Sequence, residues 1–325
     1  MEQAPSGAGG SSPKQKFVAV VAQPVKTDMD ALREAVTTIS EQAGWGSPRF
    51  YETSVEDPGR GQAKEALEAG AAIVAASGGD GTACAVAEVL AETGVPMALL
   101  PAGTGNLLAR AVGVSHNSRT AALALLTEGR ERTIDIMRVD MVRPDGSRFT
   151  ETSVVGLGIG YNADLMAGTD EELKKRTGWF AYVVSGIRAL RTHAVRARVA
   201  SDVEDPSKSL AARGAHVRKT RSILVVTCGL LVGGLRLLDD SEPDDGVMEA
   251  VVATPRSRFE LVLQLGRLIA RRDARGPNVD VIRARKNIVV ECPRATVAQI
   301  DGDPVGDVTR IEVTLRPGVL TVLSP

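Results

Sequence analysis

This chain of 325 residues has few aromatic side chains, almost no net charge and no long apolar runs. Aromatic residues are 3% of the sequence, too few for the base-stacking platforms that bind single-stranded nucleic acids. The net charge of -1 provides no overall attraction to nucleic acid. No run approaches the roughly 18 apolar residues of a membrane span, so we expect membrane contact to be peripheral. We therefore expect no nucleic-acid partner, and any anionic ligand must be bound locally.

Cysteine is also scarce, and its spacing argues against two kinds of site. The three cysteines, Cys84, Cys228 and Cys292, are odd in number and far apart, which fits neither a disulfide framework nor a CxxC metal site. This usage predicts a reduced, cytoplasmic protein. Residues 1–16 are rich in Gly, Ser and Pro but have no apolar segment of a secretory signal, so we expect a disordered tail there.

Strand-like and helix-like segments alternate over residues 17–130. The length of the chain favours two domains. The apolar run Phe17–Ala22 is typical of a parallel strand buried on both faces, and apolar residues recur at helical spacing over Met29–Ala43. Further strands are expected at 49–53, 71–76 and 97–100, and further helices at 62–69, 83–91, 107–112 and 120–127. This alternation predicts a parallel, doubly wound α/β domain.

From about residue 131 the pattern changes and becomes rich in strands. The expected strands are 132–142, 147–155, 194–200, 223–228, 248–253, 287–291 and 296–300, and the expected helices are 171–175, 180–191 and 258–271. The polar segment 202–221 is expected to loop out between two strands. Residues 131–325 thus predict a β-rich, sandwich-like domain, whose last strand we expect to return toward the first domain.

Two glycine-rich turns stand at strand ends in the first domain. Residues 77–82 (Ser-Gly-Gly-Asp-Gly-Thr) and 101–106 (Pro-Ala-Gly-Thr-Gly-Asn) each follow an apolar strand and precede a helix. Glycines let phosphate oxygens approach the main chain, and the start of a helix adds unpaired N–H groups. In parallel sheets, ligands bind at the carboxyl ends of the strands. The pair of turns therefore predicts a phosphate-binding site.

Asp80 lies among the glycines of the first turn. Such an aspartate can hold Mg²⁺, or a metal-bound water, against nucleotide phosphates. The alternative is that its carboxylate caps the following helix. Neither turn carries the lysine of a Walker A motif, which argues against a P-loop NTPase.

These motifs resemble the diacylglycerol kinase catalytic-domain family, which includes bacterial diacylglycerol kinases and sphingosine kinases. The resemblance rests on the sequences at 78–82 and 100–110, and further on those at 156–163, 233–235, 244–246 and 301–303. It implies an ATP-dependent lipid kinase with a nucleotide-binding α/β domain, a β-sandwich lipid domain and an active site between them. The expected substrates are ATP and diacylglycerol or a related lipid alcohol, with Mg²⁺ as cofactor.

The resemblance also implies which residues form the site. ATP is expected to contact Gln23, Pro24, Thr53, Gly78, Gly79, Asp80, Gly81, Thr82, Gly103, Thr104, Gly105 and Asn106. The catalytic residues are expected to be Asp80, Asp301 and Asp303, and the base that deprotonates the lipid hydroxyl is either Asp301 or Asp303. A structural Mg²⁺ is expected at Asp245 and the backbone carbonyls of Glu242 and Val247.

Asp301 and Asp303 are two residues apart, so on an extended strand both would face one side. Gly302 between them favours a turn instead, and the segment can also be read as a plain surface turn. The sequence leaves both interpretations open.

Two other functions stay open. NAD kinases share the Gly-Gly-Asp-Gly motif and a comparable two-domain plan. The other alternative is a catalytically weak regulator that binds a nucleotide or a lipid. It is open because Gln23, Ala85, Asn162 and Asp303 stand where relatives often carry Asn, Glu, Asp and Glu, in that order.

The segment 259–272 is amphipathic and has a basic end. This pattern favours a helix that packs on the core, and the alternative is a helix that contacts a membrane surface. We also expect the protein to form a homodimer and to contact the inner membrane surface transiently.

Overall fold

The computed structural model describes residues 15–160, 194–231, 235–254, 260, 275–276 and 278–325. The predicted helices at 171–175 and 180–191, and the segment 258–271 apart from residue 260, lie outside the described residues. So does Asn162. Within the part of the chain that is described, no helix is long and apolar enough to cross a membrane.

The N-terminal half contains four parallel strands in the order β4-β3-β1-β2. Their bounds are β1 Val18–Ala22, β2 Arg49–Glu52, β3 Ile73–Gly78 and β4 Met97–Pro101. Every residue of β1 and β3 is buried, as their apolar runs predict for strands covered on both faces. The parallel α/β domain expected from the sequence is confirmed.

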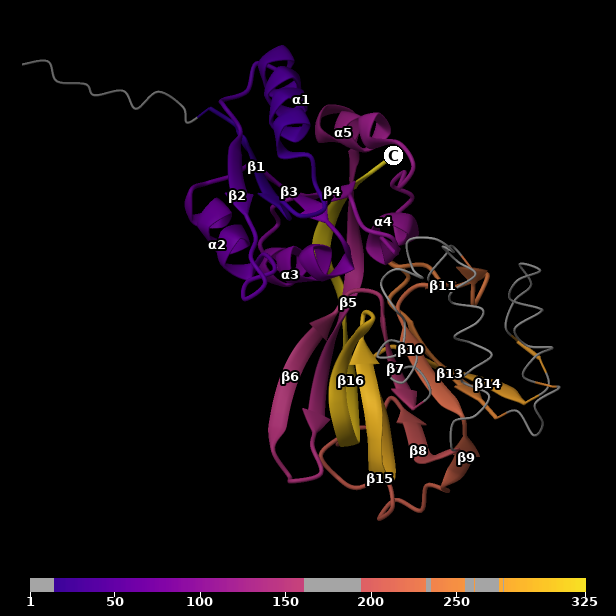
Figure 1. Ribbon diagram of the computed structural model, residues 1–325. Helices are drawn as coiled ribbons and strands as arrows, with labels where there is room; N and C mark the ends of the chain where they lie inside the picture. The colour runs from indigo at the N-terminus through magenta and orange to yellow at the C-terminus, as the bar shows by residue number, and fades with distance from the viewer. Residues whose placement is uncertain (1–14, 161–193, 232–234, 255–259, 261–274, 277) are drawn as a thin grey trace, which may run out of the picture.

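Helices cover both faces of these strands (Figure 1). Helices α1 (Met29–Gln42) and α5 (Arg119–Glu128) pack against each other on one face, and α2 (Arg60–Glu68) and α3 (Asp80–Leu90) do so on the other. The short helix α4, Leu107–Ala111, follows β4.

Side-chain caps explain where two of these helices begin. Asp28 accepts a hydrogen bond from the backbone N–H of Ala31 at 3.1 Å at the start of α1, and Ser118 accepts one from Ala121 at 3.2 Å at the start of α5. Helix α3 begins at Asp80, three residues before the sequence prediction, because glycine-rich segments carry little apolar periodicity by which a helix can be recognised. Residues 80–82 are therefore its first turn rather than a loop.

The C-terminal half is built of strands. They are β5 Arg130–Val142, β6 Arg148–Ser153, β7 Gly156–Gly160, β8 Val195–Ser201, β9 Arg218–Thr220, β10 Ser222–Val226, β11 Leu230–Leu231, β12 Leu235–Arg236, β13 Met248–Ala253, β14 Val279–Ala284, β15 Asn287–Ile300 and β16 Asp303–Ser324. The prediction of a β-rich C-terminal domain is confirmed, but several of the predicted strand boundaries were wrong. Strand β15 joins two predicted strands across a bulge between Glu291 and Thr296.

Other boundaries differ for similar local reasons. The predicted strand 147–155 ends at Ser153, because the chain turns there before β7. The predicted loop 202–221 contains strand β9, which pairs with β8. The strand ranges expected from the sequence do not include β14 and β16, although in β16 Ile311, Val313 and Leu315 alternate with polar residues as in a half-buried strand.

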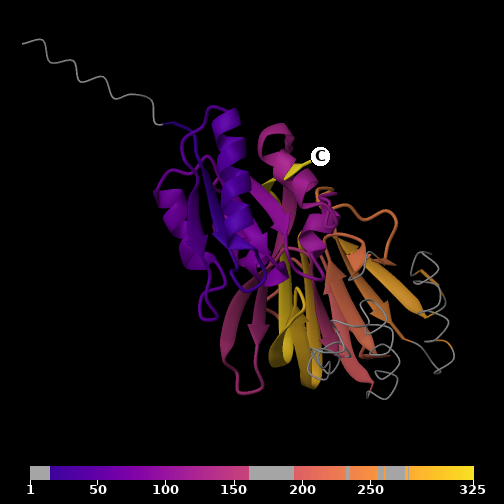
Figure 2. The ribbon, with the colours of Figure 1, turned by 45° about the horizontal axis from the view of Figure 1, so that its top comes forward.

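Strand β16 joins the two halves of the molecule. It pairs with β15 at its start, with β5 along Arg310–Ser324, and with β4 through Val322 and Met97. Strands of both halves thus belong to one mixed sheet (Figure 2). This sheet has 14 strands in the described part of the chain, and β11 and β12 pair separately. One large core lies under the N-terminal strands, and a second lies within the C-terminal strands.

The register between β5 and β16 shifts where the strands pass from one core to the other, between Arg316 and Leu320. Asp135, 2% exposed, accepts hydrogen bonds from Gly318 N–H and Gly246 N–H, both at 2.8 Å. Gly318 has φ +61°, a conformation that favours glycine. Asp135 therefore holds the bulge and the turn before β13 together.

We expect Asp135→Ala to lower the free energy of unfolding by about 2 kcal/mol or more, because two backbone N–H groups would lose their acceptor in a buried place. Denaturant unfolding measures this loss. The matched control is Asp307→Ala, at an exposed position on β16, where the change should stay within about 0.5 kcal/mol. Equal stability of the two variants would contradict the role given to Asp135.

Candidate active site

The two glycine-rich turns lie side by side at the carboxyl ends of β3 and β4. The N–H of Ala102 donates to the carbonyl of Gly78 at 2.8 Å. A Cβ placed on Gly103 would lie 2.7 Å from Cα of Gly79, closer than real side chains come. Only glycine allows this backbone-to-backbone approach, so the two turns form one surface.

Asp80 links the two turns. Its carboxylate accepts hydrogen bonds from the N–H of Asn106 at 2.9 Å and of Leu107 at 2.5 Å. It therefore caps α4 of the second turn, whereas the sequence interpretation considered a cap of its own helix. Desolvation raises the pKa of Asp80, the two N–H donors oppose this, and the charges of Asp301 and Asp303 add to it.

Asn106 shapes the second turn from within. It is 6% exposed and has φ +48°. Its Oδ1 accepts from the N–H of Gly103 at 3.1 Å, and its Nδ2 donates to the carbonyl of Gly103 at 2.7 Å. Because both ends of the amide are used by the turn, Asn106 supports the shape of the site. Thr104 is exposed on the same turn.

The remaining predicted nucleotide residues lie at the same edge of the sheet. Gln23, with Pro24 after it, follows β1, and its N–H donates to the carbonyl of Ser77 at 2.9 Å. Thr53 follows β2 and is 8% exposed. Thr82 is 4% exposed and packs against Gly78, where a Cβ would lie 2.7 Å from Thr82 Oγ1. The turns after β1, β3 and β4 are thus neighbours, with Thr53 at the end of the outer strand β2.

Asp301 and Gly302 form the turn between β15 and β16, with φ +48° and +98°. Two consecutive positive φ values are typical of a tight hairpin turn. The carboxylate of Asp301 accepts hydrogen bonds of 2.8–3.0 Å from Ser153 Oγ and from the N–H groups of Val154, Val155 and Gly156. These donors belong to the β6–β7 turn, so Asp301 attaches the hairpin to that turn.

Cys84 adds a contact from the other domain. Its Sγ donates to Oδ2 of Asp301 at 3.3 Å. Desolvation and the neighbouring carboxylate raise the pKa of the Cys84 thiol well above its ordinary value, so it stays protonated and can donate. Arg60 of α2 makes a second link between the domains, through an ion pair with Glu151 of β6 at 3.3 Å.

Asp303 faces the first glycine-rich turn. A Cβ on Gly81 would lie 3.9 Å from its Oδ2. Among the described residues, its carboxyl has no recorded hydrogen-bond or ion-pair partner. Asp303 is exposed as a residue, yet desolvation of its carboxyl raises its pKa, Asp301 adds to this, and Lys26 opposes it. The two acids of the hairpin thus differ: Asp301 is fully hydrogen-bonded, and Asp303 is free to accept a proton.

The residues expected to hold a structural Mg²⁺ share one turn before β13. Asp245 accepts from the N–H of Val247 at 2.9 Å and of Glu242 at 3.4 Å. Asp244 beside it pairs with Arg132 through two hydrogen bonds of 2.6 Å. No group of three or more His, Cys, Asp or Glu side chains in the described ranges is placed to hold a metal ion. A cation here would depend on backbone carbonyls.

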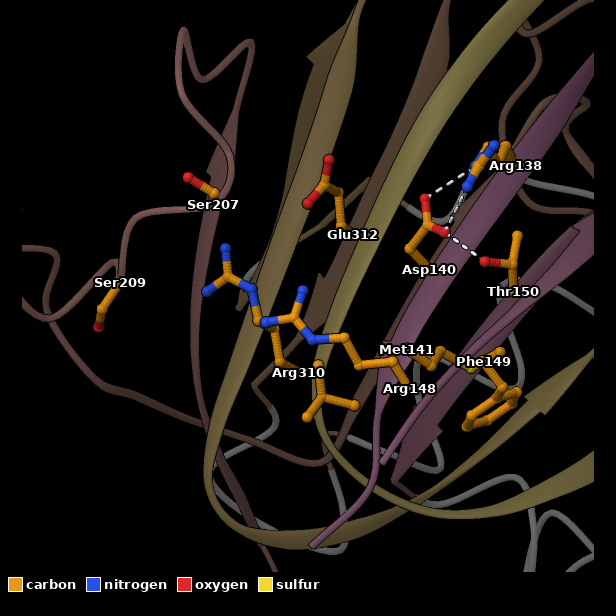
Figure 3. Close-up of a pocket in the computed structure, with 11 residues that line it drawn as sticks. Arg138, Asp140, Met141, Arg148, Phe149, Thr150, Ser207, Ser209, Arg310 and Glu312 are labelled. Carbon is orange, nitrogen blue, oxygen red and sulfur yellow. Dashed lines mark hydrogen bonds and ion pairs between the residues drawn. The ribbon is translucent and has the colours of Figure 1, made fainter. Parts of the chain in front are cut away.

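A cavity of about 480 Å³ lies elsewhere, on the outer face of β5, β6 and β16 (Figure 3). Within its lining, Arg138 donates to both carboxylate oxygens of Asp140, and Arg310 pairs with Glu291, which lies outside the lining. None of the site residues expected from the sequence lines it. We therefore place the candidate site at the glycine-rich turns.

Two residues that lie at the candidate site, Cys84 and Lys26, were not predicted from the sequence to belong to it. Cys84 was considered only for disulfides and metals, and its partner is 217 positions away. Lys26 lies three residues after Gln23, and its Nζ would be 3.4 Å from a Cβ on Gly79. The sequence signal for Lys26 was its position just after the end of the first predicted strand.

Two family models match consecutive parts of the chain. Residues 19–139 match the diacylglycerol kinase catalytic domain, and residues 153–324 match the YegS C-terminal NAD kinase beta sandwich-like domain. A Pseudomonas aeruginosa protein named "Probable lipid kinase YegS-like" is 32% identical over 268 residues, covering 81% of this chain and 80% of that protein. A protein of the same name from Stenotrophomonas maltophilia is 29% identical over 249 residues, covering 74% and 75%.

Solved structures agree with the fold. A diacylglycerol kinase structure from Bacillus anthracis has a TM-score of 0.65 at 16% identity, covering 97% of this chain and 98% of that one. Yeast NADH kinase has a TM-score of 0.50 at 11% identity, covering 96% and 84%. These likenesses concern the fold, and the family is established by the sequence matches. The chain belongs to the family of lipid kinases that combines the diacylglycerol kinase catalytic domain with the YegS-type C-terminal domain.

Proposed function

We propose that this protein transfers the γ-phosphoryl group of ATP to the hydroxyl of a lipid alcohol, with diacylglycerol as the first candidate. The observation that carries the proposal is that Asp303, a carboxylate of the C-terminal half, faces the joined glycine-rich turns of the N-terminal half. A phosphate-binding surface opposite an unpaired acid is the arrangement that phosphoryl transfer to an alcohol requires.

The glycine-rich turns provide the nucleotide site. Gly79, the N-cap of α3, has no side chain to cap the helix, so the N–H groups of the first turn, Asp80, Gly81 and Thr82, stay available to an anion. Gly103 and Gly105 keep side chains away from the neighbouring turn and from Asp80. Phosphate oxygens can therefore reach the main chain from both turns.

In this proposal Asp303 is the general base. As the lipid oxygen attacks the γ-phosphorus, the proton of the hydroxyl moves to Asp303, the new P–O bond forms, and the bond to ADP breaks. Asp301 is less suited, because its two oxygens already accept five hydrogen bonds from the protein and leave little room for the lipid hydroxyl to approach.

Mg²⁺ fits this site. Desolvation raises the pKa values of Asp80 and Asp303, and the negative charge of Asp301 raises them further. A divalent cation, when bound, supplies neutralisation of the phosphate charge. Asp80 is the residue that would hold it together with phosphate oxygens, which leaves Asp303 to take the proton. The turn with Glu242, Asp245 and Val247 is proposed as a separate, structural cation site.

The lipid is proposed to reach the site from the C-terminal domain, at a membrane surface that the protein contacts transiently. The homodimer stays a prediction from the sequence, to be measured by light scattering or ultracentrifugation.

The first test measures transfer of labelled phosphate from ATP to an extracted lipid mixture and, in parallel, to NAD. We expect label in a lipid and none in NAD. Label in NAD would favour the NAD kinase alternative. No label in either, together with thermal stabilisation by ATP, would favour the regulator.

We expect Asp303→Asn to lower kcat about 10²-fold or more while ATP binding persists, since the amide cannot take the proton. Asp301→Asn should instead lower the free energy of unfolding by about 1–3 kcal/mol, because an NH₂ group then meets hydrogen-bond donors. Steady-state kinetics and denaturant unfolding measure both effects. An active Asp303→Asn beside a stable but inactive Asp301→Asn would move the base to Asp301.

Asp80→Ala should abolish transfer and the thermal stabilisation by ATP, and it should also lower the free energy of unfolding by about 1–3 kcal/mol, as two N–H groups lose their acceptor. The matched control is Asp57→Ala, which removes a carboxylate that accepts from the N–H groups of Gly59 and Gly61 at the start of α2. The control should lose stability and keep turnover. Unchanged turnover in Asp80→Ala would remove Asp80 from the nucleotide site.

A further inference from the structure

The cavity on the outer face of β5, β6 and β16 lies away from the proposed kinase site, and strand pairing builds its floor. Two rows of register partners run across β16, β5 and β6 there, Arg310–Val142–Arg148 and Glu312–Asp140–Thr150. Directly opposite residues of paired strands share a face, and so do residues two apart on one strand. Both rows therefore lie on the same side of the sheet, and Figure 3 shows the side chain of Arg148 extending toward that of Arg310.

A loop beside this floor provides a wall of the cavity. Ser207 and Ser209 line the cavity and belong to the polar segment between β8 and β9. Arg310 pairs with Glu291, and each carboxylate oxygen of Glu291 also accepts from the N–H of Leu210 at 2.9 Å. The side chains of Arg310 and Glu291 are 19% and 13% exposed, so a largely buried ion pair anchors the loop. The wall is therefore held in place by the protein's own contacts.

Two charged groups in the lining stay without a partner. Arg138 and Asp140 bind each other through two hydrogen bonds, and Arg310 is balanced by its buried ion pair. With the residues that the structure describes, neither the guanidinium of Arg148 nor the carboxylate of Glu312 makes a hydrogen bond or an ion pair. The two groups influence each other only electrostatically. One cation and one anion thus line the same cavity and are both available to a ligand.

The surroundings of Glu312 favour a positively charged ligand group beside it. Desolvation raises the pKa of its carboxyl and Asp140 raises it further, whereas the nearby arginines oppose this. Asp140 is its register partner on β5, and like charges directly opposite each other on paired strands are destabilising. An ammonium group bound to Glu312 would reduce this repulsion.

We propose that this cavity binds a small zwitterion, whose anionic group pairs with Arg148 and whose amine pairs with Glu312. A guanidinium donates two parallel hydrogen bonds to a carboxylate or a phosphate. The volume of about 480 Å³ suits a small molecule, since such sites measure roughly 300–1,000 Å³. Two of the three arginines in the lining are already neutralised, which argues against a multiply charged anion. Because no residue of the nucleotide site takes part, the proposal does not depend on the kinase function.

Calorimetric titration of the full chain tests the proposal with four probes: phosphoethanolamine, β-alanine, inorganic phosphate and ethylamine. The first two carry an amine and an anionic group on one short chain, and the last two carry one charged group each. We expect one of the zwitterions to bind at least about tenfold more tightly than either single-group probe, which lacks one charged partner. The better zwitterion identifies the anionic group as phosphate or carboxylate. No binding of either zwitterion, or equally tight binding of inorganic phosphate, would overturn the proposal.

Two variants locate the binding in this cavity. Arg148→Gln and Glu312→Gln should each weaken binding of the zwitterion about tenfold or more, because each removes one charged partner. The matched controls are Arg130→Gln and Glu131→Gln, at exposed positions of β5 outside the cavity, and both should bind as the wild type does. The unfolding temperature without ligand checks that every variant is folded. Unchanged zwitterion binding in Arg148→Gln and Glu312→Gln would place the ligand elsewhere and refute the proposal.

Discussion

The carboxylate of Asp301 is the contact on which the arrangement of the site depends. Its oxygens accept hydrogen bonds from Ser153 and the following N–H groups of the C-terminal half and from Cys84 of the N-terminal half. The hairpin, the β6–β7 turn and α3 therefore meet at one group. Because the hairpin is held there, Asp303 faces the glycine-rich turns. One acid of the pair sets position, and the other is left to react in the proposed transfer.

A second constraint is the continuity of the sheet. Strands β5 and β16 run through both cores, and the bulge held by Asp135 lies where they cross between them. A shared sheet fixes the hairpin tip relative to the strand ends of the N-terminal half more firmly than a flexible linker would. The distance from Gly81 to Asp303 is thus set by backbone pairing and by the Asp301 contacts together.

The local elements were well predicted where the signal is local. The buried run Phe17–Ala22 and the glycines within 78–81 can each be recognised from a few consecutive residues. The partner of Asp80 was not predicted, since its carboxylate caps a helix that begins 27 residues later. Strand β16 lay outside the predicted strand ranges although its apolar residues alternate with polar ones, so its signal was present in the sequence. The merging of two predicted strands into β15 reflects a bulge that sequence periodicity does not reveal.

The fold class, the family and the two glycine-rich turns could be recognised from the sequence, because glycine spacing and apolar periodicity act over short stretches of chain. The two acids of the hairpin can be told apart only in the folded structure. Asp301 and Asp303 are chemically identical and two residues apart, and they differ through what surrounds them: five donors around one, and around the other the open space shared with Gly81 and Lys26. Such differences arise from segments more than 140 residues away in the chain, which no local pattern records.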